Sequence, residues 1–397
     1  MAGYAERRLE ILARDRARFG VGVVSELPEL VASLGATSAF VVTDSGVVAS
    51  GVVGRVIDHL QKAGIRVEVE DGVEPNPGTA AIVRGSERLR SFTSGSVDPA
   101  RLVVVGLGGG SAMDSAKVIA LHATNQRAVM SLGYHDETVA PGLPVVAVPT
   151  TAGTGSETNT YGVITDAATG RKGYVGHESV LPRVAILDPV LTLKLPPGPT
   201  AAAGVDALTH SLESLLSANP NPFAEAIALG VIRTVAEWLP RAVDDGSDLE
   251  ARSRMLLAAH YAGVGQQSGT GVGAVHAIGH AIGARGGLAH GTALATVMPE
   301  VFETYLGVRD RELALVAVAM GAAGPADDEG LAARAGIDAI EGLLERVNQR
   351  RTLSELGFAP EAHEMIAEDA VEDAAIANSP RLPSKDEVLG ILAAVSG

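Results

Sequence analysis

The chain has 397 residues, a formal net charge of −16 and no cysteine. Its composition, 46 % hydrophobic and 20 % charged residues, is that of a globular protein, and its length suggests two or three domains. The negative charge argues against nucleic acid or an anionic membrane as a partner, and the missing cysteines exclude disulfides, thiolate metal sites and cysteine nucleophiles.

The N-terminal stretch Met1–Gly20 is charged throughout and has no apolar core of the kind that a signal peptide needs. No window of about 18 uninterrupted apolar residues follows it, so no membrane span is expected. We therefore expect a cytoplasmic protein.

The first half of the chain alternates short segments rich in Val and Ile with segments of helical period. This alternation is typical of a parallel, doubly wound sheet. Helices are predicted over Val52–Ala63 and Ser111–Ala123. The predicted strands are Ser38–Thr43, Ile65–Glu70, Leu102–Gly106, Pro144–Val148 and Val184–Leu187.

The second half has no strand-like segments after the Pro-rich turn Leu195–Pro199. Long segments rich in Ala, Leu and Glu predict helices, among them Pro222–Leu239, Leu249–Tyr261 and Leu331–Glu345. Two Pro-rich turns place a domain boundary near residues 188–200. We therefore predict an α/β domain with a Rossmann-like parallel sheet over residues 1–190 and an all-helical domain over residues 191–397.

A glycine-rich turn follows the strand that begins at Leu102: it contains Gly108, Gly109, Gly110 and Ser111 and leads into a helix. Glycines let the backbone approach a phosphate, and the start of the helix offers unpaired N–H groups. A turn without a ligand would have the same pattern, but three glycines and a serine at this junction favour pyrophosphate binding.

Asp44 follows an earlier strand, so the order differs from the usual Rossmann fingerprint, in which the acidic residue follows the glycines. By itself, Asp44 fits a helix N-cap better. In a dinucleotide site it would bond the adenosine ribose and repel a 2′-phosphate, which favours NAD. A second polar loop, Pro149–Glu157, follows the next strand and suits either a further cofactor contact or an elaborate cap.

Histidines concentrate between residues 210 and 290. Asp206 and His210 are spaced i, i+4, which puts both on one helix face; His276 and His280 repeat that spacing, and His290 follows. Each pair alone fits an ordinary helix face better than a metal site. Together, a carboxylate and several imidazoles without thiolate predict a divalent metal: Fe²⁺, Zn²⁺, Mn²⁺ or Co²⁺.

These residues resemble the iron-dependent (group III) alcohol dehydrogenases. The block from Asp206 to Glu213 and the spacing His276-x3-His280-x9-His290 carry the resemblance. Further blocks in the family's order extend it over nearly the whole chain: Val73–Pro77, Gly108–Lys117, Pro149–Glu157 and Asp188-Pro189.

The resemblance implies an NAD-linked enzyme that oxidises an alcohol, or reduces an aldehyde or ketone, at a metal that is Fe²⁺ or alternatively Zn²⁺. It implies the metal ligands Asp206, His210, His276 and His290, with His280 in the active site but not a ligand. Because the unperturbed pKa of an imidazole suits proton transfer, our hypothesis is that His280 relays the proton. The implied cofactor-binding residues are Asp44, Asn76, Gly108, Gly109, Gly110, Ser111, Asp114, Thr150, Thr151, Thr154 and Lys172.

The partners expected on this basis are a small alcohol or aldehyde and further copies of the chain. Gln266 and Gln267 lie where the family commonly has an aromatic or apolar residue, so a roomier or more polar substrate pocket is expected. Two alternatives share the fold: a maleylacetate-reductase-like NADH-dependent enzyme, which generally needs no metal, and a glycerol-dehydrogenase-like zinc enzyme. A scaffold protein that kept the fold without catalysis is a third.

Overall fold

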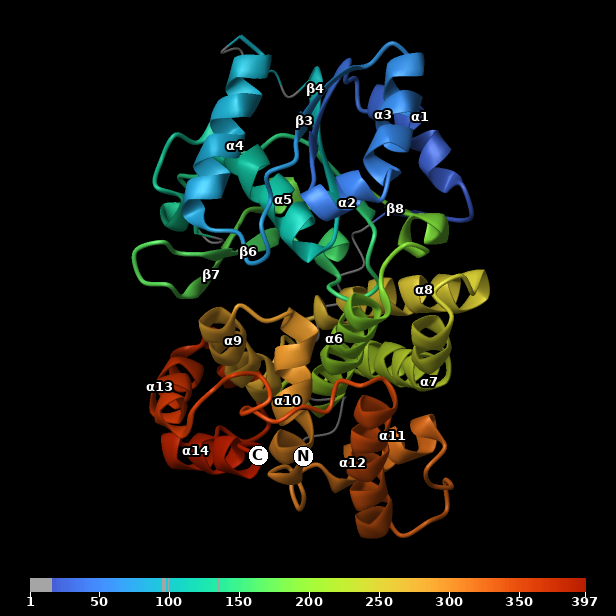
Figure 1. The fold of residues 1–397 in the computed structure, drawn as a ribbon, viewed down its shortest axis with the longest axis vertical. Coiled ribbons are helices and arrows are strands. Elements are labelled where there is room, and N and C mark those ends of the chain that lie inside the picture. The colour runs from blue at the N-terminus through green and yellow to red at the C-terminus, as the bar shows by residue number, and fades with distance from the viewer. Residues whose placement is uncertain (1–15, 95–97, 99, 134–135) are drawn as a thin grey trace. The chain divides into compact units, whose positions relative to one another are not determined.

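The computed structural model describes residues 16–94, 98, 100–133 and 136–397 (Figure 1). Most of the N-terminal stretch, in which we expect no signal peptide, lies outside these residues. The chain divides into two compact units. Among the described residues, the sheet unit comprises residues 16–203 and Arg241–His260, and the helical unit comprises Gly204–Pro240 and Tyr261–Gly397.

The sheet unit is built on a parallel sheet of six strands in the order β1-β8-β5-β4-β2-β3, and a separate antiparallel hairpin joins β6 to β7. Neighbouring strands pair in register, for example Ser38 with both Arg66 and Leu102. The strands are β1 (Ala17–Phe19), β2 (Ser38–Val42), β3 (Arg66–Glu70), β4 (Leu102–Gly108), β5 (Val145–Pro149), β6 (Tyr161–Thr165), β7 (Lys172–Gly176) and β8 (Val184–Leu187).

Helices cover both faces of this sheet, with α1 and α3 on one side and α4 and α5 on the other (Figure 1). Successive side chains of a strand point to opposite faces, so Val41 belongs to one core and Phe40 to the other. The helices are α1 (Leu27–Ser33), α2 (Ser45–Ala49), α3 (Val52–Lys62), α4 (Thr79–Phe92) and α5 (Gly110–Thr124).

Every further α-helix begins after the last strand. They are α6 (Pro197–Leu216), α7 (Pro222–Asp244), α8 (Leu249–Gln266), α9 (Ala274–Gly286), α10 (His290–Glu303), α11 (Asp310–Met320), α12 (Glu329–Arg346), α13 (His363–Glu372) and α14 (Lys385–Ala394). In the helical unit, α9 packs against both α10 and α13, and α11 packs against α12. Short 3₁₀ segments complete the fold: η2 (Val23–Glu26), η3 (Val129–Ser131), η4 (Ser156–Thr158), η5 (Glu178–Val180), η6 (Pro189–Thr192), η7 (Pro360–Ala362) and η8 (Ala374–Asn378).

The predicted fold class, a parallel Rossmann-like sheet followed by an all-helical part, is confirmed. The prediction missed β1 and the β6–β7 hairpin, and it ended α8 early, at Tyr261 instead of Gln266. The helix α8 runs on through Gly265, which packs closely on α7. An added Cβ at Gly265 would lie 3.2 Å from the side chain of Ile227. None of the helices described is long and apolar enough to cross a membrane.

Candidate metal centre and cofactor site

The metal centre starts from one face of α6. Asp206, His210 and Glu213 are spaced four and three residues apart, which places them on the same side of the helix over two turns. All three side chains are buried, and each has a polar group that needs a partner. The two other candidate histidines come from α9 and from the start of α10.

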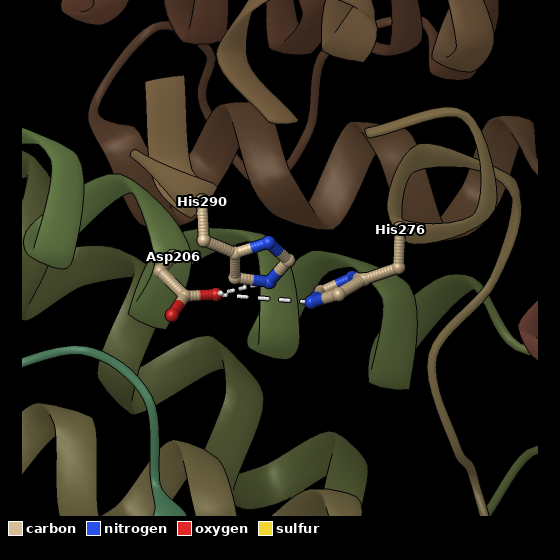
Figure 2. A group of neighbouring side chains, drawn as sticks. All are labelled: Asp206, His276 and His290. Carbon is tan, nitrogen blue, oxygen red and sulfur yellow. Dashed lines mark ion pairs between the residues drawn. The ribbon is translucent and has the colours of Figure 1, made fainter. Parts of the chain in front are cut away.

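Figure 2 shows Asp206, His276 and His290 pointing toward one another. The Oδ1 atom of Asp206 lies 3.7 Å from Nε2 of His276 and 3.6 Å from Nε2 of His290. The potential ligand atoms of these three residues all lie within 4.8 Å of one another. Four ligands at roughly 2.0–2.2 Å around a tetrahedral metal would stand about 3.3–3.6 Å apart, so the observed separations suit one ion.

His210 lies beside these three residues, with its Nδ1 atom as close to Asp206 as Nε2 of His276 is. Its Nδ1 atom is 3.7 Å from Asp206 Oδ1, and its ring stacks on that of His276 with the centroids 4.9 Å apart. The side chain of His290 is 29 % exposed, against 3 % for that of His276 and 8 % for that of His210. A small molecule would therefore reach the centre from the side of His290.

The buried polar atoms at the centre test whether a metal fits. Asp206 Oδ1 and His276 Nε2 have no hydrogen-bond partner among the described residues, since 3.7 Å is too long for a hydrogen bond. Each buried, unsatisfied polar group costs about 1–3 kcal/mol. A cation between these atoms removes that cost, and a carboxylate with imidazoles is a donor set that Fe²⁺ and Zn²⁺ accept.

The electrostatics of the centre point the same way. Burial raises the pKa of Asp206, but the neighbouring imidazoles of His210, His290 and His276 outweigh burial and hold that pKa well below its usual range. Burial lowers the pKa of His276, while Glu213 and Asp206 raise it more strongly, to about 9. Two carboxylates thus concentrate negative charge around one imidazole, and the site attracts a cation.

Glu213 holds His276 from behind. Its Oε2 atom lies 2.5 Å from Nδ1 of His276, and its Oε1 atom accepts a hydrogen bond from the backbone N–H of Val275 at 2.8 Å. A carboxylate at Nδ1 keeps the proton on that nitrogen and leaves the Nε2 lone pair for a metal, as carboxylates behind metal-binding histidines commonly do.

His280 lies next to the same cluster, with its ring stacked on that of His290 at 5.3 Å and edge-on to that of His276 at 5.7 Å. Its Nδ1 atom lies 2.8 Å from Oδ2 of Asp373, the residue that ends α13. His280 therefore belongs to the cluster of imidazoles but is held by a carboxylate of its own.

The candidate cofactor site lies in the sheet unit, at the carboxyl ends of β2, β4 and β5. A cavity of about 850 Å³ opens there. The strand order reverses between β2 and β4, since β3 follows β2 on one side and β4 lies on the other; such switch points are where doubly wound sheets bind ligands. The predicted cofactor residues that line it are Asp44, Gly109, Gly110, Ser111, Thr150 and Thr151.

The backbone of the glycine-rich turn leaves no room for side chains. Gly108 has a φ of 153°, and a Cβ there would lie 2.7 Å from Cβ of Ala112. Gly109 is the N-cap of α5, and Gly110 and Ser111 of its first turn line the cavity with it. On the neighbouring strand, Asp44 caps α2: its Oδ1 accepts from the backbone N–H groups of Gly46 and Val47, at 2.9 and 3.0 Å.

Five predicted cofactor residues do not line the cavity, and one of them is Gly108 of the glycine-rich turn. Thr154 packs beneath it, against Gly110, and Asn76 follows Pro75 of the lining with a left-handed φ of 54°. Lys172 begins β7 in the hairpin. Asp114 is occupied within the protein: it accepts from Ser156 Oγ and from Val163 N–H, and it forms an ion pair with the fully buried Lys117 at 3.2 Å.

Sequence reasoning missed three carboxylates that pair with imidazoles: Glu213, Asp373 and Glu157. Glu213 could have been found, because it lies seven residues after Asp206 on the same helix face. Asp373 gave no such signal, since it lies 93 residues from His280. The same holds for Glu157, which lies 3.2 Å from His260 in a buried pair of the sheet unit, 103 residues away in sequence.

Comparison with known families gives a consistent result over both halves of the chain. Residues 15–189 match the family described as iron-containing alcohol dehydrogenase. Residues 200–396 match the C-terminal domain of the Fe-containing alcohol dehydrogenase family. Together the two matches cover nearly all of the described residues.

Similar proteins agree with this match. The NAD-dependent methanol dehydrogenase of Bacillus methanolicus is 33 % identical over 94 % of this chain and 96 % of its own length. The 1,3-propanediol dehydrogenase of Citrobacter freundii is 35 % identical over 97 % of this chain and 98 % of its own. A crystal structure of a 1,3-propanediol oxidoreductase superposes with a TM-score of 0.92 at 33 % identity, covering 98 % of this chain and all of that one.

The motifs that suggested a family in the sequence are therefore matched by whole-length similarity and by the fold. This similarity indicates an enzyme that oxidises alcohols or reduces the corresponding carbonyl compounds. This chain belongs to the iron-containing alcohol dehydrogenase family.

Proposed function

We propose that this enzyme transfers a hydride between NAD(H) and a small alcohol or its carbonyl product, with a divalent metal held by Asp206, His210, His276 and His290. One observation carries the proposal. Three imidazole nitrogens stand 3.6–3.7 Å from one buried oxygen of Asp206. Fe²⁺ is the proposed ion because of the family, and Zn²⁺ is the alternative that the same donors accept.

When bound, the metal would supply Lewis acidity that eases loss of the alcohol proton near neutral pH, and NAD would supply the hydride acceptor. The residues of the chain prepare this chemistry. Glu213 holds His276 in the tautomer that turns Nε2 toward Asp206. His280, stacked on His290, is the proposed relay for the alcohol proton because imidazole exchanges protons near neutral pH.

The cavity at the ends of β2, β4 and β5 is the proposed NAD site. Gly108, Gly109, Gly110 and Ser111 would receive the pyrophosphate at the start of α5. Asp44 would accept hydrogen bonds from the adenosine ribose through Oδ2, because Oδ1 already caps α2. Its charge disfavours the 2′-phosphate of NADP. The remaining proposed cofactor residues are Asn76, Asp114, Thr150, Thr151, Thr154 and Lys172.

The proposed substrates are short alcohols and diols. Similar proteins include a methanol dehydrogenase, 1,3-propanediol dehydrogenases and, in Bacillus subtilis, a choline dehydrogenase that is 34 % identical over 92 % of this chain. The panel of substrates to be assayed should therefore contain neutral alcohols, diols and a cationic alcohol. A cytoplasmic location and assembly into a homo-oligomer stay predictions, to be checked by fractionation and by sedimentation.

The proposal is tested by following NADH absorbance over this panel with metal-stripped protein, then after anaerobic addition of Fe²⁺ or Zn²⁺. We expect activity only with metal, and none in His276→Ala. His363→Ala is the matched control, because His363 is also a buried histidine of the helical unit but contacts Ser396. Full activity without metal would refute the four-ligand site and favour the maleylacetate-reductase-like alternative.

A further inference from the structure

A half-buried carboxylate, that of Asp373, contacts Nδ1 of His280. Oδ2 of Asp373 lies 2.8 Å from Nδ1 of His280, and the two side chains are only 15 % and 9 % exposed. His280 lies on α9 and Asp373 at the end of α13, two helices that pack against each other. The contact is therefore part of the packing of the helical unit.

The carboxylate is itself fixed in place. Asp373 is the N-cap of η8, and its Oδ1 atom accepts a hydrogen bond from the backbone N–H of Ala375 at 2.8 Å. One oxygen thus faces a backbone donor and the other faces His280. Burial raises the pKa of Asp373, but the hydrogen bond and proximity of His280 lower it below its usual range, so the group stays ionised at neutral pH.

An ionised carboxylate only accepts hydrogen bonds, so the atom facing it on His280 must carry a proton. A neutral imidazole carries one proton, and its lone pair then lies on the other nitrogen, Nε2. We propose that Asp373 is a positioning residue that fixes His280 as the Nδ1–H tautomer with its ring stacked on His290, so that Nε2 accepts the alcohol proton. This inference rests on the proposed function of His280.

A salt bridge between Asp369 and Arg285 joins the same two helices. Asp369, one turn before Asp373 on α13, accepts hydrogen bonds from Nε and Nη2 of Arg285 on α9, at 2.9 and 2.6 Å. That pair ties α9 to α13 through the guanidinium group of Arg285. Asp369→Asn is therefore a matched control for Asp373→Asn.

Asparagine at position 373 makes the test sharp. Its amide oxygen still caps η8 by accepting from Ala375, while its NH₂ group faces His280 and donates to Nδ1. The expected result is that His280 changes to the Nε2–H tautomer while the fold and its stability stay close to those of the wild type. The variant therefore reverses the tautomer instead of removing the residue's packing.

The tautomer is read by ¹⁵N NMR of the full-length Zn²⁺-loaded protein labelled at histidine, with the His280 signals assigned by their loss in His280→Ala. We expect Nδ1–H in the wild type and in Asp369→Asn, and Nε2–H in Asp373→Asn. An Nε2–H tautomer in the wild type, or no change in Asp373→Asn, would overturn the inference. This readout does not depend on activity.

Kinetics test the consequence. We expect His280→Ala to lower kcat roughly 100-fold, and Asp373→Asn to lower it roughly 10- to 100-fold with the NADH and metal affinities unchanged. In the His280→Ala background, Asp373→Asn should change kcat by less than about twofold, because the two residues act as one unit. Asp369→Asn should keep kcat.

The outcomes separate the two proposals. If Asp373→Asn keeps kcat while His280→Ala loses it, the positioning role of Asp373 is wrong and the proposed function stands. If His280→Ala keeps full activity, the relay and this inference are both wrong. The metal-dependent reaction is judged apart from both, by metal removal and by His276→Ala.

Discussion

Replacing Glu213 by Gln probes how the metal centre is built. The substitution keeps the shape of the side chain and removes its charge. In the native protein, Oε1 accepts from the N–H of Val275 at 2.8 Å and Oε2 accepts from Nδ1 of His276 at 2.5 Å. An amide has only one oxygen, so it can serve one of these donors while its NH₂ group faces the other.

The magnitude follows from that count. Losing one hydrogen bond to a charged, buried acceptor costs about 1.5–3 kcal/mol. If the amide turns its NH₂ group toward His276, the ring must move its proton to Nε2, the atom that faces Asp206. Either way the metal-binding form of His276 becomes less stable, and we expect the metal Kd to rise roughly 10- to 150-fold.

The assay is a competition between the protein and a chromophoric chelator for Zn²⁺, repeated anaerobically with Fe²⁺. Glu157→Gln is the matched control, because Glu157 is also a buried carboxylate paired with an imidazole, that of His260, but lies in the sheet unit. It should leave the metal Kd unchanged. A Kd for Glu213→Gln within about twofold of the wild-type value would refute the reasoning.

Four further predictions follow. Zn²⁺ at 100 times its Kd should add about 2.7 kcal/mol of stability and raise Tm by about 3 °C in calorimetry; an equal rise in His276→Ala would contradict the site. Lys117→Met should destabilise the protein by about 3–5 kcal/mol in urea unfolding, because half-buried Asp114 loses its ion pair and the buried acceptors of Ser156 and Asn159 lose their donor; a loss below about 1 kcal/mol would contradict this. Gly108→Ala should cost about 1–3 kcal/mol and weaken NADH binding in fluorescence titrations, and wild-type affinity would show that the turn does not face the dinucleotide. Asp44→Asn keeps an oxygen to cap α2 and should raise the ratio of kcat/KM for NADP over NAD at least about tenfold, so an unchanged ratio would remove Asp44 from cofactor selection.

The sequence by itself determined the fold class, because the period of its hydrophobic residues changes from strand-like to helical near residue 195. It also determined which residues of α6 share a face, since the spacing of Asp206 and His210 becomes geometry as soon as the helix forms. The glycine-rich turn after β4 was visible for the same local reason. What it missed in the fold, the short edge strand β1 and the β6–β7 hairpin, has little hydrophobic period because their residues are largely exposed or half-buried.

Only the tertiary structure decided which carboxylate stands behind which imidazole. Glu213 meets His276 across 63 residues, and Asp373 meets His280 across 93. Neither pairing has a periodic or compositional signature. Each arises because separate helices pack at fixed angles, and because a polar group buried by that packing is stable only where a partner of matching hydrogen-bonding character is buried beside it.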